Sequence, residues 1–405
     1  MMDSQTTSSA VGLLRLDLLV NIRFPGLRAH GIQVAAMAEA LAATGLIVDV
    51  VVPRRYPYRA INPWSHYDVK RTFRIQRIAS LDVIDMFPQR FQRLPFLLQS
   101  VSFGWRALAR VAVERQGGVL VRDHYSLDIL AHGLRRRDLK RVGAEIHDLP
   151  LRSAPRRRLI DNLKRIPAVI TISDGLKADL VADGLEEEKI LVARDGVHLS
   201  RFEGLPDAED ARRHLGLAAD VPTVVYAGQL YPWKGVDDLV KAVGRLPDLQ
   251  LVVVGGISPD LERVRSLADK HAPGRVWFCG SVPYGAVPFH LAAGDIIALP
   301  NSGKEEISAR YTSPLKLFEA MASSRPIVAS DLPSLKEVLK HGVNAHLVEP
   351  DDPEALAEGI EELLRNPKRS SGLAERARRD VQPFDWKERG RTVAYYLRDH
   401  LKVER

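Results

Sequence analysis

Short apolar runs alternate with amphipathic stretches along most of the chain. The runs are rich in Val, Ile and Leu and are bounded by Gly, Pro or polar residues, which is typical of buried strands. They cover residues 13–20, 47–53, 117–121, 167–173, 223–228, 249–256, 276–280, 295–300 and 326–330. Between them, apolar residues recur every three or four positions, as in a helix with one buried face. Alternation of strands and helices predicts parallel sheets.

The pattern forms two separate series. The first opens with strand 13–20, a helix over 32–45 that stops at Gly45, and strand 47–53. The second begins at strand 223–228, after a polar helical linker at 207–222. Two consecutive series of this kind predict an α/β protein with two Rossmann-like domains that face one interdomain cleft.

Residues 94–114 have the spacing of a long amphipathic helix. One side carries the apolar residues Leu94, Leu97, Leu98, Val101, Trp105, Leu108 and Ala112. We expect this side to pack on the sheet of its own domain; the alternative is a helix that faces a membrane or an acceptor. Residues 53–90 mix Pro, Arg and aromatic residues, and their pattern predicts no regular element.

Charge is distributed unevenly. The net charge is +7, but residues 1–200 carry 30 Lys and Arg against 21 Asp and Glu, hence +9, and the remaining 28 and 30 give −2. A basic first half suits a phosphorylated acceptor or an anionic membrane surface, although a solvated face has the same composition. No apolar run approaches the ~20 residues of a membrane span and no signal peptide is apparent, so we expect a cytoplasmic protein, peripheral at the inner face of the membrane if the charge is used there.

Chemistry is suggested first by residues 309–339. Ser313 can cap a helix whose first turn holds Pro314, and the free N–H groups of such a turn suit a phosphate. Lys234, in the loop after strand 223–228, is a flexible cation of the kind that binds phosphate. The single Cys279 lies in an apolar run and is expected to be a core residue.

These segments resemble the donor-binding region of glycosyltransferase family 4, group 1 type, which has the GT-B fold. Glu319-Ala320-Met321-Ala322 matches the family's ribose-binding glutamate and its Ala-Met-Ala run, and Lys234-Gly235 matches the diphosphate-binding Lys-Gly. The chain departs from the family at three donor positions: Tyr311 replaces a sugar-binding glutamate, Pro314 a glycine and Gln229 an arginine.

The resemblance implies further site residues. It implies that Gly31 contacts the donor from a glycine-containing loop and that Val282 lies where the base is recognised. It also implies that His147 contacts the donor sugar near the reacting centre. Ser313, Pro314 and Leu315 would form the phosphate-binding helix start. The catalytic set is then His147, Lys234 and Glu319. The implied domains are 1–200 on the acceptor side, 201–378 on the nucleotide-sugar side, and a helix at 379–405 that crosses back.

The implied activity is retaining transfer of a sugar from a nucleotide sugar to a sugar, lipid-linked or small-molecule acceptor. No Asp-x-Asp triplet occurs, so we expect no metal and no other cofactor, and nothing indicates nucleic-acid binding. Three alternatives remain: a GT-B sugar-nucleotide epimerase, a dinucleotide-dependent enzyme, which lacks its GxGxxG fingerprint here, and a degenerate binding or scaffold protein, which the departures at Tyr311 and Gln229 keep open.

Overall fold

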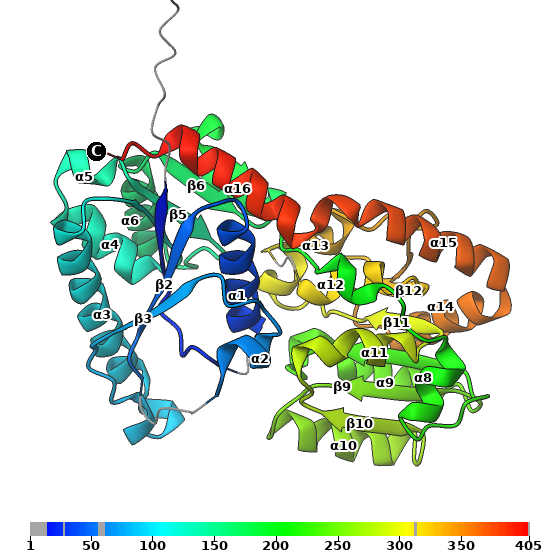
Figure 1. Ribbon diagram of the computed structural model, residues 1–405. Helices are drawn as coiled ribbons and strands as arrows, with labels where there is room; N and C mark the ends of the chain where they lie inside the picture. The colour runs from blue at the N-terminus through cyan, green and yellow to red at the C-terminus, as the bar shows by residue number, and fades with distance from the viewer. Residues whose placement is uncertain (1–13, 27–28, 56–60, 312–313, 404–405) are drawn as a thin grey trace, which may run out of the picture.

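Two sheets, each flanked by helices, lie side by side in the computed structural model (Figure 1). The structure describes residues 14–26, 29–55, 61–311 and 314–403. We call the parts built on the two sheets the N-terminal and the C-terminal domain. This architecture confirms the predicted α/β class with two parallel sheets; the predicted domain boundaries stay predictions.

The N-terminal sheet has seven parallel strands in the order β3-β2-β1-β4-β5-β6-β7. They are β1 (Arg15–Leu19), β2 (Ile47–Pro53), β3 (Arg74–Ile78), β4 (Gly118–Val121), β5 (Val142–Ile146), β6 (Ala168–Thr171) and β7 (Ile190–Val192). Its helices are α1 (Ala29–Ala42), α2 (Pro63–Tyr67), α3 (Arg93–Val113), α4 (His124–Gly133), α5 (Arg136–Leu139), α6 (Ser153–Lys164) and α7 (Asp174–Ala182).

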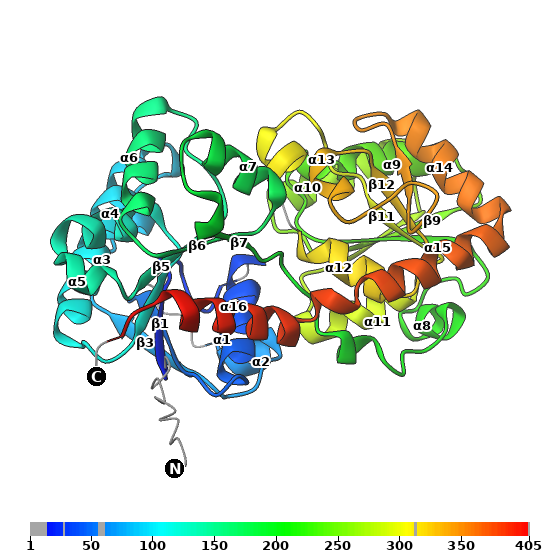
Figure 2. The same ribbon diagram turned by 90° about the horizontal axis from the view of Figure 1, so that it is seen from above.

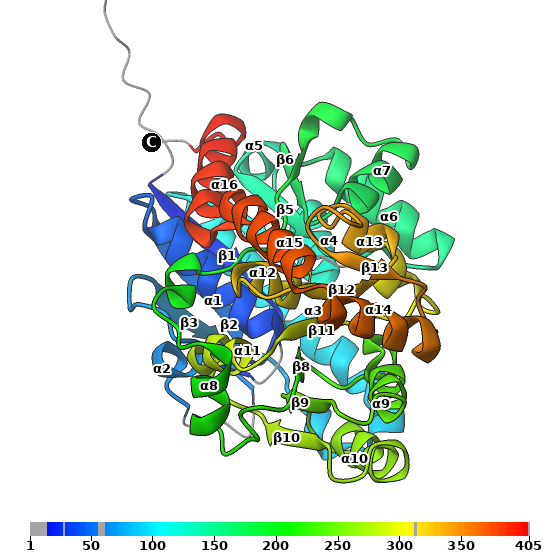
Figure 3. The ribbon, with the colours of Figure 1, turned by 90° about the vertical axis from the view of Figure 1, so that its right-hand side faces the viewer.

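The C-terminal sheet has six parallel strands in the order β10-β9-β8-β11-β12-β13. They are β8 (Thr223–Ala227), β9 (Gln250–Val254), β10 (Val276–Gly280), β11 (Ile296–Leu299), β12 (Ile327–Ser330) and β13 (His346–Val348). The helices are α8 (Ala208–His214), α9 (Val236–Gly244), α10 (Asp260–His271), α11 (Val287–Ala292), α12 (Leu315–Ala322), α13 (Pro333–Lys336), α14 (Pro353–Arg365) and α15 (Pro367–Asp380). In Figure 3, α14 and α15 lie toward the viewer, outside this sheet.

The chain crosses between the domains twice, and the two crossings touch. Val197 and Asp385 form a parallel β-bridge. The Val197 N–H donates to the Phe384 carbonyl (2.9 Å), and the Trp386 N–H donates to the Val197 carbonyl (3.1 Å). After the second crossing, α16 (Trp386–His400) packs along α1 of the N-terminal domain (Figure 2). Trp386, Val393 and Leu397 are buried there.

Strands β3, β7 and β13 lie where the apolar pattern predicted none, and β7 has only three residues. Strand β3 reads Arg-Ile-Gln-Arg-Ile and is partly exposed along its length, because it forms the edge of its sheet. Strand β13 has only three residues, His346–Val348, too few for a periodic signal. Helix α1 also starts earlier than predicted, at Ala29 rather than residue 32.

Helix α3 forms where it was expected, but the prediction of its buried side was wrong. The face that packs on the domain holds Gln99, Ser100, Phe103, Ala107 and Val111. Most of the side expected to be buried is exposed: Leu94 is 73% exposed and Trp105 59%, whereas Leu108 is buried as expected. In the described part of the chain, no helix is long and apolar enough to span a membrane.

Candidate functional site

The candidate site forms where the order of the C-terminal sheet reverses. Strands β8 and β11 are neighbours there although two strands separate them in sequence. Ligands of open α/β sheets bind beyond the carboxyl ends of strands at such a point. The loop after β8 supplies Gln229 and Lys234, the end of β11 supplies Asn301, and α12 supplies Lys316 and Glu319.

The backbone of the Lys234 loop packs closely against the segment after β11 at Gly235. Gly235 has φ +71°, and a Cβ there would lie 1.6 Å from the Pro300 carbonyl oxygen, so this position requires glycine. The preceding Lys234 is partly buried, with its Nζ 3.8 Å from the centre of the Trp233 ring. Burial lowers the pKa of Lys234 to about 7.

A second lysine, which the sequence interpretation left outside the site, lies close to Lys234. Lys316 is buried, and its Nζ has no hydrogen-bond partner among the described residues. It lies 4.9 Å from the centre of the Tyr226 ring. Burial lowers the pKa of Lys316 well below its usual range, and the nearby charge of Lys234 lowers it further. No carboxylate of the described residues forms an ion pair with either ammonium group.

Buried amides beside the two lysines also lack partners. Asn301 is fully buried, and neither its Nδ2 nor its Oδ1 is hydrogen-bonded within the described structure. Gln229 is partly buried, and its Oε1 also has no hydrogen-bond partner there. Buried polar atoms are normally paired, so this cluster points to a polar ligand that completes it. Asn301 comes shortly after β11, and the only signal in the sequence is this position beyond the carboxyl end of a strand.

Glu319 lies about one turn beyond Lys316 on α12. It is 6% exposed and accepts a hydrogen bond from the hydroxyl of Tyr284, in the short helical turn η6 (Tyr284–Ala286). Burial raises the pKa of Glu319 to about 7, although Tyr284 and Arg201 act to lower it. Arg201 stacks over the Tyr284 ring at 5.1 Å and pairs with Asp68 of the N-terminal domain at 3.0 Å.

On the N-terminal side, His147 belongs to a network of paired charges. It follows β5, and its Nε2 lies 2.6 Å from Arg122 Nη2 and 3.1 Å from Glu145 Oε1. Arg389 of α16 donates to the same Glu145 oxygen at 2.9 Å. Burial opposes ionisation of Glu145, but Arg122 and Arg389 outweigh it and hold the pKa of Glu145 well below its usual range.

Asp195 connects the two halves of the site. Its Oδ1 accepts a hydrogen bond from Gln33 Nε2 at 2.6 Å. Burial raises the pKa of Asp195, whereas the charges of Arg389 and His147 act to lower it. The charge of Asp195 also acts on Tyr284, the partner of Glu319. The structure therefore brings the His147 network and the Tyr284–Glu319 pair to one boundary between the domains.

Tyr311 makes a contact between domains. Its hydroxyl donates to Asp179 of α7 at 2.5 Å, and Arg310 pairs with Asp179 at 3.0 Å. The ring is 5% exposed and belongs to a hydrophobic cluster of the N-terminal domain. Burial, followed by the bond to Asp179, raises the pKa of Tyr311 to about 12. With its hydroxyl so engaged, a contact with the donor sugar stays a prediction.

The remaining predicted residues occupy varied places. Gly31 lies inside α1 rather than in a turn, and a Cβ there would lie 2.3 Å from Tyr67 Oη, so tight packing explains this glycine. Val282 is partly buried against the core of the C-terminal domain. Pro314 and Leu315 are the N-cap and first residue of α12, whereas Ser313 lies outside the described residues. Donor contacts of these residues stay predictions.

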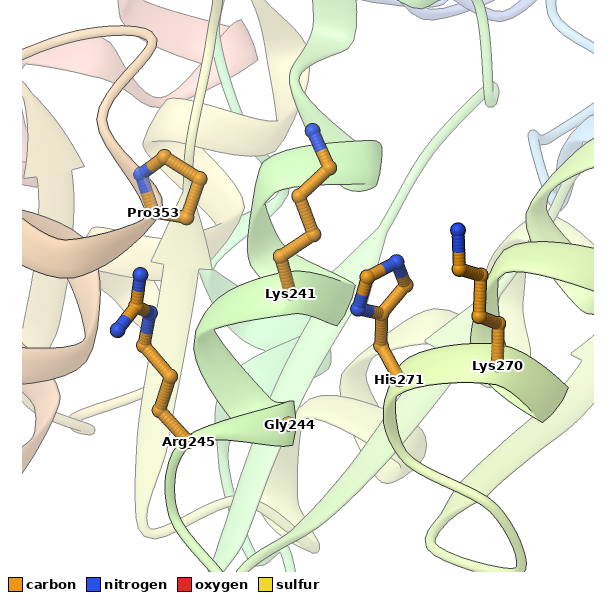
Figure 4. Close-up of a pocket in the computed structure, with 6 residues that line it drawn as sticks. All are labelled: Lys241, Gly244, Arg245, Lys270, His271 and Pro353. Carbon is orange, nitrogen blue, oxygen red and sulfur yellow. The ribbon is translucent and has the colours of Figure 1, made fainter.

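A basic pocket of about 350 Å³ lies at the other end of α9, lined by Lys241, Gly244, Arg245, Lys270, His271 and Pro353 (Figure 4). Lys241 pairs with Asp238 at 2.9 Å and Arg245 with Glu354 at 3.3 Å. Helix α9 starts at Val236, two residues after Lys234, and the pocket lies at its other end, so the pocket is separate from the candidate site. Within the described residues, no three His, Cys, Asp or Glu side chains are grouped to hold a metal ion; metal independence stays a prediction.

Known proteins resemble the C-terminal domain, which contains the candidate site, in sequence. Residues 207–380 match the family model for glycosyl transferases group 1. The D-inositol 3-phosphate glycosyltransferase of Xylanimonas cellulosilytica is 34% identical over 239 residues, 54% of this chain and 55% of that protein. The chain spans about half the length of the curated relatives it matches.

Solved structures extend the likeness to nearly the whole chain. The sucrose-phosphate synthase of Thermosynechococcus elongatus has a TM-score of 0.79 at 22% identity, over 95% of this chain and 98% of that one. Anabaena HepE in complex with UDP has a TM-score of 0.73 at 19% identity, over 95% and 99%. The chain thus has the GT-B fold, and its residues 207–380 resemble the group 1 glycosyltransferases.

Proposed function

We propose that this protein is a retaining glycosyltransferase of the family 4 type, which transfers a sugar from a nucleoside-diphosphate sugar to an acceptor without a metal. The observation that carries the proposal is the pair of lysines, Lys234 and Lys316, which lie close together without a carboxylate partner among the described residues. Burial lowers the pKa of both amines, and the charge of Lys234 lowers that of Lys316 further, so both carry a positive charge together only when an anion lies beside them. A diphosphate is such an anion.

The proposed donor pose follows from the order of groups along the site. Lys234, Lys316 and the free N–H groups at the start of α12 bind the diphosphate, and Glu319 accepts the ribose hydroxyls one turn further along. The base then lies toward Val282 and the sugar toward the N-terminal domain. There, Arg122 and Glu145 hold the His147 ring in place beside the donor sugar.

In the reaction, the bond between the anomeric carbon and the phosphate oxygen breaks, and a bond to the acceptor hydroxyl forms on the same face. The acceptor proton passes to an oxygen of the departing diphosphate. Lys234 and Lys316 stabilise the negative charge that develops on this leaving group, which is the main electrostatic task of the site. The products are the glycosylated acceptor and a free nucleoside diphosphate.

The alternative of a degenerate scaffold protein rested on the family residues missing at Gln229 and Tyr311, and this proposal explains both departures. The arginine missing at Gln229 is replaced as a charge by Lys316, which is buried close to Lys234. The glutamate missing at Tyr311 is replaced by a residue that joins the domains. Both departures then belong to a working site of different composition.

Thermal unfolding against a panel of UDP, GDP, ADP, CDP and dTDP tests the donor site, first without metal and then with magnesium. UDP is the first choice because HepE, of the same fold, was solved with UDP. A ligand at ~100 times its dissociation constant stabilises the folded state by about 2.7 kcal/mol. We expect one nucleotide to raise the midpoint without metal, and a flat panel would contradict the proposal.

Two variants separate the subsites. Lys234→Ala should weaken every nucleoside diphosphate but not the nucleoside, since it removes a phosphate contact. Glu319→Ala should weaken both, because the ribose hydroxyls lose a charged acceptor worth ~1.5–3 kcal/mol. Release of nucleoside diphosphate that requires an acceptor then distinguishes transfer from binding alone.

A further inference from the structure

Exposed apolar side chains gather on one part of the N-terminal domain. Of the 20 large hydrophobic residues that are exposed in the described structure, nine lie between residues 81 and 105. They belong to the short helical turns η1 (Ile84–Met86) and η2 (Gln89–Phe91), their flanks, and the first half of α3. We call this surface the α3 patch. Helix α3 runs along the outer flank of the domain (Figure 1).

Helix α3 is apolar on two sides, and the domain covers only one of them. Phe103, Ala107 and Val111 are buried against the domain. Leu94, Leu97, Leu98 and Trp105 recur at helical spacing on another side and are 73%, 40%, 46% and 59% exposed. A helix that is apolar all round is normally buried all round, so the outer side is expected to be covered by something else.

The charge around the patch indicates what covers it. Residues 86–113 contain Arg90, Arg93, Arg106 and Arg110 and no Asp or Glu. Arg110 pairs inward with Asp17 at 2.9 Å, whereas Arg90, Arg93 and Arg106 are exposed. The nearby carboxylates Asp82 and Asp85 pair with Arg55 and Arg23. The surface thus combines apolar side chains with uncompensated positive charge.

A second copy of this chain fits the patch poorly. A twofold interface brings the same surface of both copies together. The exposed arginines of one copy would then face those of the other, with no acidic residue between positions 86 and 113 to pair with them. Like charges brought together in this way oppose association.

We propose that the α3 patch docks the protein on the surface of an anionic lipid membrane. Leucine and aromatic side chains enter the boundary between headgroups and acyl chains, and the arginines bind the anionic headgroups. Trp105 suits this depth because its ring has both an apolar body and a polar N–H. The inference concerns a surface outside the donor site and does not depend on the proposed activity.

Flotation with lipid vesicles tests this directly, using the full chain without nucleotide. We expect recruitment to vesicles of phosphatidylcholine mixed with phosphatidylglycerol, little recruitment to phosphatidylcholine alone, and a decrease as salt rises. The double variant Leu94→Ser/Leu98→Ser should bind at least ~10-fold less, since it removes apolar burial. Arg93→Ala/Arg106→Ala should lose the dependence on anionic lipid.

Matched controls come from the C-terminal domain. Trp277, 44% exposed on β10, should tolerate replacement by Ser without loss of vesicle binding. Lys270→Ala in the basic pocket of Figure 4 removes a comparable positive charge and should leave recruitment unchanged. Each variant is compared by its thermal unfolding midpoint and, where a nucleotide binds, by its affinity for that nucleotide, so misfolding is distinguished from lost docking.

Three results would overturn the proposal. The first is equal binding of the Leu94→Ser/Leu98→Ser variant and the unchanged protein. The second is absence of recruitment to anionic vesicles at low salt. The third is a concentration-dependent dimer, seen by sedimentation velocity and lost in the same variant, because a second copy would then cover the patch.

Discussion

Buried charges are arranged in opposite ways in the two domains. In the N-terminal domain, Glu145 lies between Arg122 and Arg389, so the carboxylate and both cations have a partner. In the C-terminal domain, Lys316 is buried beside the partly buried Lys234, and neither has a carboxylate partner in the described structure. The first arrangement pairs charges of opposite sign, although Arg122 Nε, Arg122 Nη1 and Glu145 Oε2 have no hydrogen-bond partner in the described structure. The second arrangement contains no anion from the described residues.

This difference separates residues that support the fold from residues that bind a ligand. A paired network holds its members in place whether or not a substrate is present. An unpaired buried cation costs stability in the free protein, and a bound anion recovers that cost. The comparison therefore predicts opposite effects on stability when one cation of each group is removed.

The largest effect is expected for Arg389→Met. This change removes a buried partner of Glu145 and the hydrogen bonds that Arg389 donates to the Arg194 and Ala193 carbonyls. The free energy of unfolding in urea should fall by about 3–5 kcal/mol. Arg391→Met on the same helix is the control: its side chain is 68% exposed, so the loss should stay below about 1 kcal/mol. Equal losses would mean that the network contributes little.

Lys316→Met should have two effects of opposite sign. The free protein should gain about 1–3 kcal/mol, because a buried amine without a hydrogen-bond partner is removed. Affinity for the nucleoside diphosphate should fall by about 1.5–3 kcal/mol, the value of a charge-assisted hydrogen bond. Thermal unfolding with and without nucleotide measures both. Lys336→Met, with a 50% exposed side chain on α13, should change neither; a destabilised Lys316→Met would refute the unpaired-cation interpretation.

The pH dependence of nucleotide affinity should depend on Lys234. Its pKa is lowered to about 7 in the free protein, and a bound diphosphate favours the charged form, so binding takes up a proton above that pH. Affinity should therefore fall as pH rises above 7, by about tenfold per unit for one proton. Calorimetry between pH 6.5 and 9 measures this. Burial also lowers the pKa of Lys316, so Lys316 can take up a proton on binding as well. Lys234→Arg keeps its charge throughout and should remove only the Lys234 part of the slope; an unchanged slope would exclude Lys234.

Tyr311→Phe should have the smallest effect. The change removes the hydrogen bond to Asp179 but keeps the ring, so the free energy of unfolding should fall by about 1 kcal/mol. Affinity for the free nucleoside diphosphate should not change. Tyr395→Phe, 76% exposed on α16, is the control and should alter nothing. Weaker binding of the nucleotide sugar alone would show that Tyr311 contacts the sugar.

Apolar periodicity was sufficient to predict most of the fold. The central strands of both sheets are buried on both faces, so they form continuous apolar runs that a sequence reveals. The edge strand β3 and the short β13 gave no such signal. The face of α3 was mispredicted because periodicity shows only that a side is apolar, not what covers it.

The sequence points to candidate site residues only where they follow a motif. Lys234 and Glu319 were proposed through their resemblance to a family; the structure places Glu319 about one turn from Lys316, which lies near Lys234, and their donor contacts stay predictions. Lys316 and Asn301 were missed, because the burial and missing partners that single them out are properties of the packed structure. Tyr311 shows the converse: its position in a motif suggested a donor contact, whereas its hydroxyl is bonded to Asp179 of the other domain.

The bridge between Val197 and Asp385 has a mechanical consequence. Because the two chain crossings are hydrogen-bonded to each other, any change in the angle between the domains would have to bend both crossings together. Opening along that angle would separate Arg201 from Asp68 and Tyr311 from Asp179. The joined crossings therefore act as a tether that keeps the partners of both contacts within reach of each other.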